Sequence, residues 1–197
     1  MGQHTAWQGK ITVNRAPVGS RAKIRARMDI RTAEESEIGP LAKLWYDAWQ
    51  DAHAQILPAA LTRLRTLESF QERLHAALPY VRVVGPPAAP LGFCIVKGDE
   101  LYQLFVAAEA RGSGVAAALI ADAEARLLEE GVEVAWLACA IGNERAARFY
   151  EKWGWNRVRN VVSRLATPEG FFPLEVWRYE KRLACPPMST AHGPSST

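Results

Sequence analysis

The chain has 197 residues and a formal net charge of +3. This length is enough for one domain with its own hydrophobic core. So small a net charge gives no indication of nucleic-acid binding, and no apolar run approaches the ~20 residues of a membrane-spanning helix. The three cysteines show no metal-like spacing and the four histidines are spread out. We therefore expect a cytoplasmic protein with no metal, no nucleic-acid partner and no membrane partner.

The two ends of the chain differ in composition from the middle. Residues 1–27 carry several arginines near their end and show no sustained apolar period. They are predicted to be a flexible basic leader. Residues 184–197 are rich in Pro, Ser, Thr and Gly and are predicted to be a disordered tail. The patterned sequence between them predicts a single domain over residues 28–183.

The first part of this domain is predicted to be a strand followed by two helices. Residues 28–32 read as the strand. Residues 34–54 carry apolar side chains at helical spacing, and Pro58 breaks the pattern. Residues 60–77 repeat the helical spacing.

Three strand-like runs follow, over residues 80–84, 91–97 and 100–106. A Pro-rich turn separates the first two runs, and Gly98-Asp99 closes a hairpin between the second and the third. Consecutive hairpins predict an antiparallel meander.

The third strand leads into a glycine-bearing loop and then a helix. Gly112 and Gly114 have no Cβ, so the loop can turn tightly and a ligand can approach closely. Ser113 is predicted to cap the helix, which runs up to Gly131. The free N–H groups and the positive dipole end of a helix favour an anion, so the loop predicts a phosphate site.

Three kinds of phosphate loop have this order of elements. A P-loop would need a Lys-Ser/Thr pair, which is missing. Residues 112–117 match the G-x-G-x-x-A pattern of an NAD-binding oxidoreductase. However, the next strand, over residues 133–140, ends without the required acidic residue, and the preceding meander does not fit that fold. Arg111, Gly114 and Ala116 match a third pattern, Arg/Gln-x-x-Gly-x-Gly/Ala. This pattern resembles the acyl-CoA pyrophosphate loop of the GCN5-related N-acetyltransferase (GNAT) family.

A second motif follows at a separation usual for that family. Residues 143–153 read as a helix with Asn143 as N-cap and Gly154 just past its end, before strands over 155–165 and 172–183. The segment resembles the family's second signature, Asn-x-x-Ala-x-x-Phe-Tyr-x-Lys-x-Gly-Phe/Trp. The matching residues are Asn143, Ala146, Phe149, Tyr150, Lys152 and Trp155.

The resemblance implies both a fold and an activity. The implied fold is an α/β GNAT domain, with a largely antiparallel mixed sheet, a central splayed parallel pair and flanking helices. The implied activity moves an acetyl group from acetyl-CoA to a primary amine by direct attack through a tetrahedral intermediate. The acceptor is a small-molecule amine, a peptide N-terminus or a lysine, and a homodimer is one assembly that the family allows. The alternative is a non-catalytic acyl-CoA-binding regulatory module of the same fold.

The resemblance also assigns roles to residues. Tyr150 is the expected general acid, the alternative being an aromatic that only packs the helix. Glu100 is the first candidate for the general base, since strand alternation predicts a face shared with Val106. His53 is the second candidate. A bulge beside Val106 is implied to free backbone groups for the acyl-CoA. The expected acetyl-CoA-binding residues are Leu104, Phe105, Val106, Arg111, Gly112, Ser113, Gly114, Val115, Ala116, Asn143, Ala146 and Tyr150.

Acceptor choice is implied to lie with the first helices and the final hairpin. Their aromatic side chains either wall the acceptor site or pack in the core. These side chains are Trp45, Tyr46, Trp49, Phe171 and Phe172.

Overall fold

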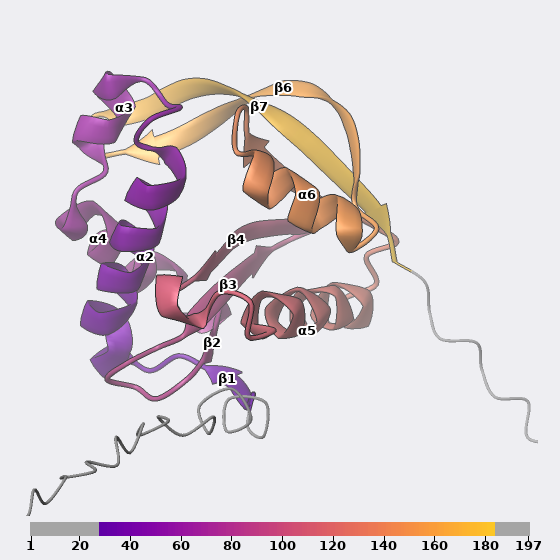
Figure 1. Cartoon of the computed structure of the whole chain (residues 1–197), viewed down its shortest axis with the longest axis horizontal. Helices are drawn as coiled ribbons and strands as arrows, with labels where there is room; N and C mark the ends of the chain where they lie inside the picture. Colours follow the sequence, from indigo (N-terminus) through magenta and orange to yellow (C-terminus); the bar gives the residue numbers. More distant parts are fainter. Residues whose placement is uncertain (1–27, 184–197) are drawn as a thin grey trace, which may run out of the picture.

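The computed structural model describes residues 28–183, and its centre is a seven-stranded sheet (Figure 1). The strands lie in the order β1-β2-β3-β4-β5-β7-β6. All neighbouring pairs are antiparallel except β4 and β5, which are parallel. The strands are β1 (Ile30–Thr32), β2 (Val81–Val84), β3 (Gly92–Lys97), β4 (Glu100–Val106), β5 (Val134–Ala140), β6 (Asn156–Thr167) and β7 (Gly170–Arg182). The predicted leader and tail lie outside the described residues.

Helices cover both faces of the sheet. The α-helices are α2 (Ile38–His53), α3 (Ala59–Leu64), α4 (Leu67–Ala77), α5 (Val115–Glu129) and α6 (Glu144–Lys152). Three 3-10 turns complete the elements, namely η1 (Glu35–Glu37), η2 (Leu78–Tyr80) and η3 (Ala108–Ala110). Within residues 28–183, no helix combines the length and the apolar character that a membrane crossing requires.

Most predicted elements are confirmed, including the antiparallel meander and the central parallel pair, which is β4 and β5. The helix predicted over residues 60–77 is instead two helices. Arg65 leaves the helical region with φ −95° and ψ 67°, and Thr66 is extended. The Thr66 side chain then accepts a hydrogen bond from the Ser69 N–H and starts α4 as its N-cap.

The core on one face of the sheet is organised around Trp45 of α2, which is fully buried. Its ring lies 5.0 Å from that of Phe70 on α4, 5.3 Å from Phe93 on β3 and 5.9 Å from Phe105 on β4. On the opposite face the Cys94 thiol of β3 donates to the Leu119 carbonyl of α5. Since adjacent strand residues point to opposite faces, α2 and α5 sandwich the meander.

The pairing of β3 with β4 shifts by one residue. It is regular from Gly92↔Val106 to Ile95↔Gln103 and then continues as Val96↔Leu101, so Tyr102 is the extra residue of a bulge. The family resemblance implies a bulge beside Val106, and this position is wrong because the bulge lies at Tyr102. Paired residues share a face of the sheet, so the shift places Glu100 on the face of Gln103 and Phe105. The predicted face shared by Glu100 and Val106 is also wrong, because simple alternation fails across a bulge.

A buried ion pair fixes the entry into α2. Glu37 is 1% exposed, and its carboxylate accepts bonds of 2.6 and 2.7 Å from Arg31 on β1 and one of 2.9 Å from the Glu34 N–H. Arg31 also donates to the Gly85 carbonyl at 3.1 Å. These bonds join β1, η1 and the β2–β3 turn. The hydrogen bond from Arg31 outweighs burial and holds the pKa of Glu37 below its ordinary value.

This depressed pKa predicts a pH-dependent difference between the wild type and Glu37→Gln. The carboxylate is present above its unfolded pKa of about 4.3, and its stabilisation is lost as pH falls through the lower folded pKa. We expect Glu37→Gln to lower the free energy of unfolding by about 2 kcal/mol at pH 7, since hydrogen bonds to a charged group are lost. Denaturant unfolding should show the gap closing below about pH 4. The matched control is Glu72→Gln at an exposed site on α4. A gap that stays constant down to pH 3 would contradict the assignment.

Candidate active site

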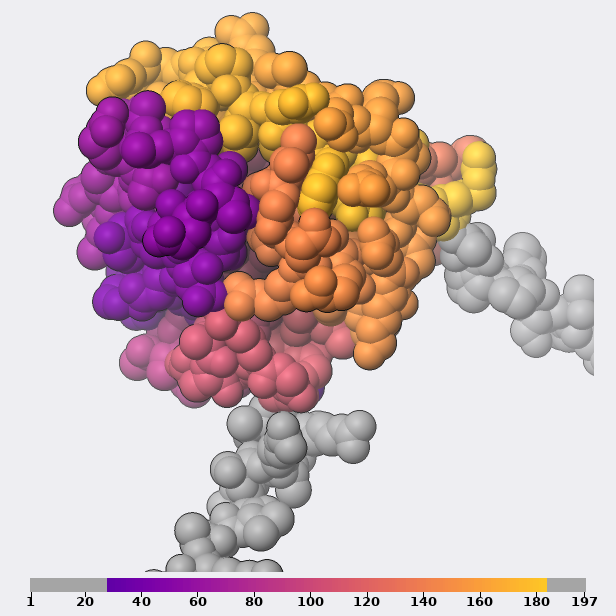
Figure 2. All heavy atoms as spheres, turned by 45° about the horizontal axis from the view of Figure 1, so that its top comes forward, coloured from indigo at the N-terminus to yellow at the C-terminus, as the bar shows by residue number. Residues whose placement is uncertain are grey.

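The two parallel strands separate almost at once and leave a cavity between them. The pairing of β4 with β5 is confined to Glu100↔Trp136, beside a 3.0 Å bond from the Trp136 N–H to the Asp99 carbonyl. Beyond this point a cavity of about 600 Å³ lies between residues 101–106 of β4 and 138–140 of β5. Residues of α2 and α6 also line it, and Figure 2 shows the surface hollowed between the purple α2 region and the orange α6 region.

The glycine loop lies at one end of this cavity. Gly112 has φ 73° and Gly114 has φ 98°, both in the left-handed region that glycine tolerates. Gly114 is the N-cap of α5 and brings no side-chain acceptor. The Ser113 hydroxyl instead donates to the Ala110 carbonyl at 2.6 Å, so the predicted Ser113 cap is wrong. The first-turn N–H groups of α5 therefore keep the capacity to bind an anion.

The cavity brings together nearly all the predicted acetyl-CoA residues. Every one of them lines it except Ser113. Asn143 also acts as the predicted N-cap of α6, because its side chain accepts from the Ala146 N–H at 3.2 Å. The predicted Gly131 and Gly154 helix ends are confirmed, with φ 82° and 80°. The local sequence signals therefore converge on one space.

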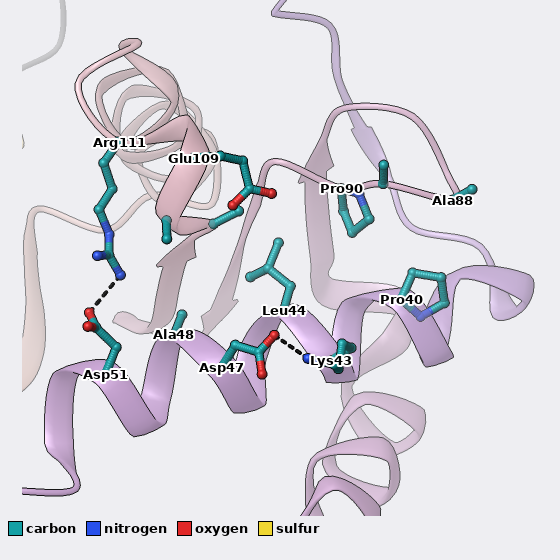
Figure 3. Close-up of a pocket in the computed structure, with 13 residues that line it drawn as sticks. Pro40, Lys43, Leu44, Asp47, Ala48, Asp51, Ala88, Pro90, Glu109 and Arg111 are labelled. Carbon is teal, nitrogen blue, oxygen red and sulfur yellow. Dashed lines mark hydrogen bonds and ion pairs between the residues drawn. The ribbon is translucent and has the colours of Figure 1, made fainter.

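An acidic side chain that the sequence did not single out links the loop to both helices. Asp51 of α2 accepts from Arg111 at 2.7 Å and from Arg145 of α6 at 2.8 Å. Figure 3 shows Arg111 reaching down to Asp51 beside a smaller, adjoining cavity lined by Leu44 and Glu109. The Arg145 hydrogen bond, together with the charge of Arg111, keeps the pKa of Asp51 below its ordinary value. One carboxylate thus balances two cations at this end of the cavity.

Tyr150 lies on the wall formed by α6. Its ring packs 5.6 Å from Phe149, 6.5 Å from Trp155 and 6.0 Å from Tyr179. The neighbouring Tyr179 hydroxyl donates to Glu151 at 3.2 Å, whereas the Tyr150 hydroxyl forms no hydrogen bond within residues 28–183. Tyr150 lines the cavity. Burial raises its pKa well above the ordinary value, which keeps the phenol protonated. Such a phenol can donate a proton.

Glu100 lies at the narrow end of the splay, where β4 and β5 still pair. Burial, followed by the charge of Asp99, raises its pKa to about 7. A carboxylate with this pKa exchanges protons readily near neutrality.

His53 also lines the cavity. Burial lowers its pKa to about 4, so the ring is neutral at pH 7. Its Nδ1 lies 3.1 Å from the Trp49 carbonyl, which leaves Nε2 as the other polar atom. The low pKa makes His53 a weaker base than Glu100 at neutral pH.

The predicted aromatic wall is mostly absent from the cavity. Of its five members, Trp49 alone lines it. Trp45 is core, and Phe171 is 64% exposed on the final hairpin. In their place stand two arginines, Arg65 and Arg73, which the helical periodicity had given no reason to single out.

Comparison with known proteins places the chain in a family. A sequence model described as the acetyltransferase (GNAT) family matches residues 41–155, which is more than half of the chain. The chain therefore belongs to the acetyltransferase (GNAT) family. A search of curated proteins found no significant match.

Solved structures agree in fold. A GCN5-related N-acetyltransferase from Rhodopseudomonas palustris superposes with a TM-score of 0.63 at 18% identity, covering 80% of this chain and 97% of that one. The PaiA N-acetyltransferase from Thermoplasma acidophilum, in complex with coenzyme A, gives 0.56 at 17%, covering 78% and 98%. A ribosomal-protein-alanine N-acetyltransferase from Brucella melitensis gives 0.55 at 21%, covering 79% and 99%. These likenesses confirm the predicted GNAT fold.

The glycine loop yields a stability prediction. A Cβ on Gly114 would be held at φ 98° and lie 3.1 Å from the Met28 Cε. We expect Gly114→Ala to lower the free energy of unfolding by about 1–2 kcal/mol, the penalty for a side chain in the left-handed region. The control is Gly39→Ala in α2, where a Cβ meets nothing within 4 Å and alanine should be neutral or stabilising. Thermal melts of both variants test this. Equal melting temperatures would show that the loop relaxes freely.

Proposed function

We propose that residues 28–183 form an N-acetyltransferase domain that moves an acetyl group from acetyl-CoA to a primary amine. The observation that carries this proposal is the splayed cavity, with an anion-binding loop at one end and a pair of proton-transfer groups along it. Membership of the acetyltransferase family supports it, and so does the neighbour described in complex with coenzyme A.

The cavity suits the long, polyanionic shape of acetyl-CoA. The pyrophosphate would lie on the glycine loop, against the N–H groups of Gly112, Gly114 and the first turn of α5. The unpaired backbone edges of β4 and β5 offer hydrogen bonds to an amide-bearing arm. Arg111 and Arg145, which both form ion pairs with Asp51, supply further positive charge.

Acetyl-CoA supplies the activated acetyl group, and the chain's own residues handle the protons. The acceptor must reach the thioester as a neutral amine, so Glu100 takes its proton directly or through water. Backbone N–H groups of β4 favour negative charge on the thioester oxygen. The Tyr150 hydroxyl donates a proton to the departing sulfur, and the second proton that the acceptor nitrogen loses as the amide forms restores the phenol. Burial raises the pKa of both groups. Glu100, with a pKa of about 7, is ionised in about half of the molecules at neutral pH, whereas Tyr150 stays protonated.

Calorimetric titration with acetyl-CoA, using NAD as the control ligand, tests the cofactor. We expect micromolar binding of acetyl-CoA alone, followed by acetyl transfer in an amine screen. Tyr150→Phe should keep that binding and lose about 10²- to 10⁴-fold in turnover, since general acid catalysis is removed. Tyr80→Phe, at a tyrosine 51% exposed, is the matched control. Binding without transfer in the wild type would favour a regulatory acyl-CoA module, and no binding at all would reject both readings.

The role of Glu100 predicts a pH profile. The base acts when deprotonated, so wild-type kcat/KM should rise about tenfold per pH unit and level off above about pH 7. Glu100→Gln should lower the plateau by about 10²-fold or more and abolish the rise near pH 7. Glu129→Gln, at an exposed site on α5, should leave the profile unchanged. If kcat/KM of Glu100→Gln rises with pH in parallel with that of the wild type, another group takes the proton.

A further inference from the structure

Two arginines reach the end of the cavity that lies away from the glycine loop. Arg65, at the end of α3, is 3% exposed and donates to the Ala166 carbonyl at 2.8 Å near the tip of the β6–β7 hairpin. Arg73 of α4 donates to the Tyr102 hydroxyl at 3.2 Å, with its guanidinium 4.2 Å above the Trp45 ring. Tyr102 lies near the start of β4, whereas the glycine loop follows the other end of that strand. At the rise of an extended chain, Val106 at that end lies about 13 Å from Tyr102.

These two positive charges lack the compensation that the other cavity arginines have. Arg111 and Arg145 share Asp51. Over residues 28–183, no carboxylate forms an ion pair with Arg65 or Arg73. Their partners are a carbonyl oxygen, a phenol and an aromatic face. Arg65 is buried and Arg73 is half-buried. A cation that is removed from water without an anion is destabilising, so this arrangement is expected where an anion arrives from outside.

The titration behaviour of the neighbours agrees with this placement. Burial, followed by the charge of Arg73, lowers the pKa of Arg65 to about 10, which leaves it protonated at neutral pH. Burial opposes ionisation of Tyr102, but the charge and hydrogen bond of Arg73 together with the charge of Lys97 outweigh it and lower the pKa of that phenol. The site therefore already stabilises negative charge on a neighbouring oxygen.

We infer that Arg65 and Arg73 form an anion subsite for the acceptor, which is an amine that also carries a carboxylate or a phosphate group. This inference rests on the proposed acetyltransferase activity. The anionic group docks on the two guanidinium groups, whose planar donors suit carboxylate and phosphate oxygens. The amino group of the same molecule then points along β4 towards Glu100. Acceptor choice thus depends on charge as well as on shape.

The same charges explain how the amine could lose its proton. Two nearby cations disfavour an ammonium group and lower its pKa, which eases transfer of the proton to Glu100. The ammonium form of an amine without an anionic group meets only that repulsion, so such an acceptor binds more weakly. The subsite would therefore combine recognition of the acceptor with its activation.

Matched acceptors test this inference. The panel contains α- and ω-amino acids, their carboxamides, aminoalkyl phosphates and simple alkylamines, each assayed for acetyl transfer. We expect kcat/KM for the anionic members to exceed that of their uncharged counterparts by about 100-fold, as expected for charge-assisted bonds. The carboxylate and phosphate arms identify which anion is preferred. Arg73→Gln should reduce this preference about 10- to 100-fold through KM, with the acetyl-CoA dissociation constant unchanged.

Controls separate recognition from stability and from the cofactor site. Arg63→Gln removes an exposed arginine of α3 that does not line the cavity, and it should change nothing. Arg65→Gln should act as Arg73→Gln does, but Arg73 carries the test if loss of the Ala166 bond unfolds the protein. Transfer to amines with no anion preference, or weakened acetyl-CoA binding in Arg73→Gln, would overturn the inference.

A binding measurement keeps the inference testable if no amine is acetylated, an outcome that would reject the proposed activity by itself. Calorimetric titration with glutarate and with inorganic phosphate, in the presence of CoA, reports on the subsite directly. Saturable binding that weakens at least tenfold in Arg73→Gln but not in Arg63→Gln supports the anion subsite. The absence of saturable binding in the wild type overturns it.

Discussion

The parting of β4 from β5 is the constraint on which the site depends. One register point, Glu100↔Trp136, joins the two strands, and Asp99 locks it through its carbonyl and through a 2.9 Å bond from the Trp136 indole to its carboxylate. Past this point β5 pairs, among the strands of residues 28–183, only with β7 on its other edge. Backbone donors and acceptors of both strands are therefore left facing the cavity. Unpaired edges of this kind need a partner, and a ligand rich in amides can supply one.

The walls hold this opening apart by packing rather than by hydrogen bonds across it. The Trp45 cluster fixes α2 and α4 against β3 and β4, and the Tyr150 ring packs α6 towards Tyr179 of β7. Aromatic side chains bury large areas with few rotatable bonds, so they set the distance between elements rigidly. The ion pairs of Asp51, which join α2 to the glycine loop and to α6, are half-exposed and weak by comparison. The rigid part of the cavity is thus the part enclosed by the packed aromatic side chains. The part that a ligand can rearrange is the end where Asp51 pairs with the two arginines.

Sequence could predict the features that depend on local signals. The strand–glycine loop–helix order and the α6 signature rest on residues a few positions apart, and the structure brings their side chains into one cavity. The helix break at Arg65 escaped prediction because the apolar spacing of residues 60–77 continues through it. Ser113 was a plausible cap by residue type, but Gly114 holds that position. The face of Glu100 was mispredicted because alternation assumes a regular strand, whereas the bulge at Tyr102 depends on β3.

The arginine pair could not be predicted for a stronger reason. Arg65 meets Ala166 across 101 positions of sequence, and Arg73 meets Tyr102 across 29. In the helical pattern both look like ordinary solvent-facing charges, since helix periodicity places them off the apolar stripe. Their contacts with the β6–β7 hairpin and with the bulged strand β4 exist only in the folded protein. The lack of a carboxylate partner for the two arginines within residues 28–183 can therefore be seen only in the structure.

The two proposals constrain one another through electrostatics. Acetyl transfer to an amine requires a neutral nucleophile at a pH where most amines are protonated, so the proton must leave before or during attack. A base with a pKa of about 7 accepts that proton poorly from an amine in water but well from one whose ammonium form is disfavoured by nearby cations. An uncompensated pair of cations would also weaken binding of the same amine. An anionic group on the acceptor resolves this conflict, because it draws the molecule to the arginines while its amino group is held at Glu100.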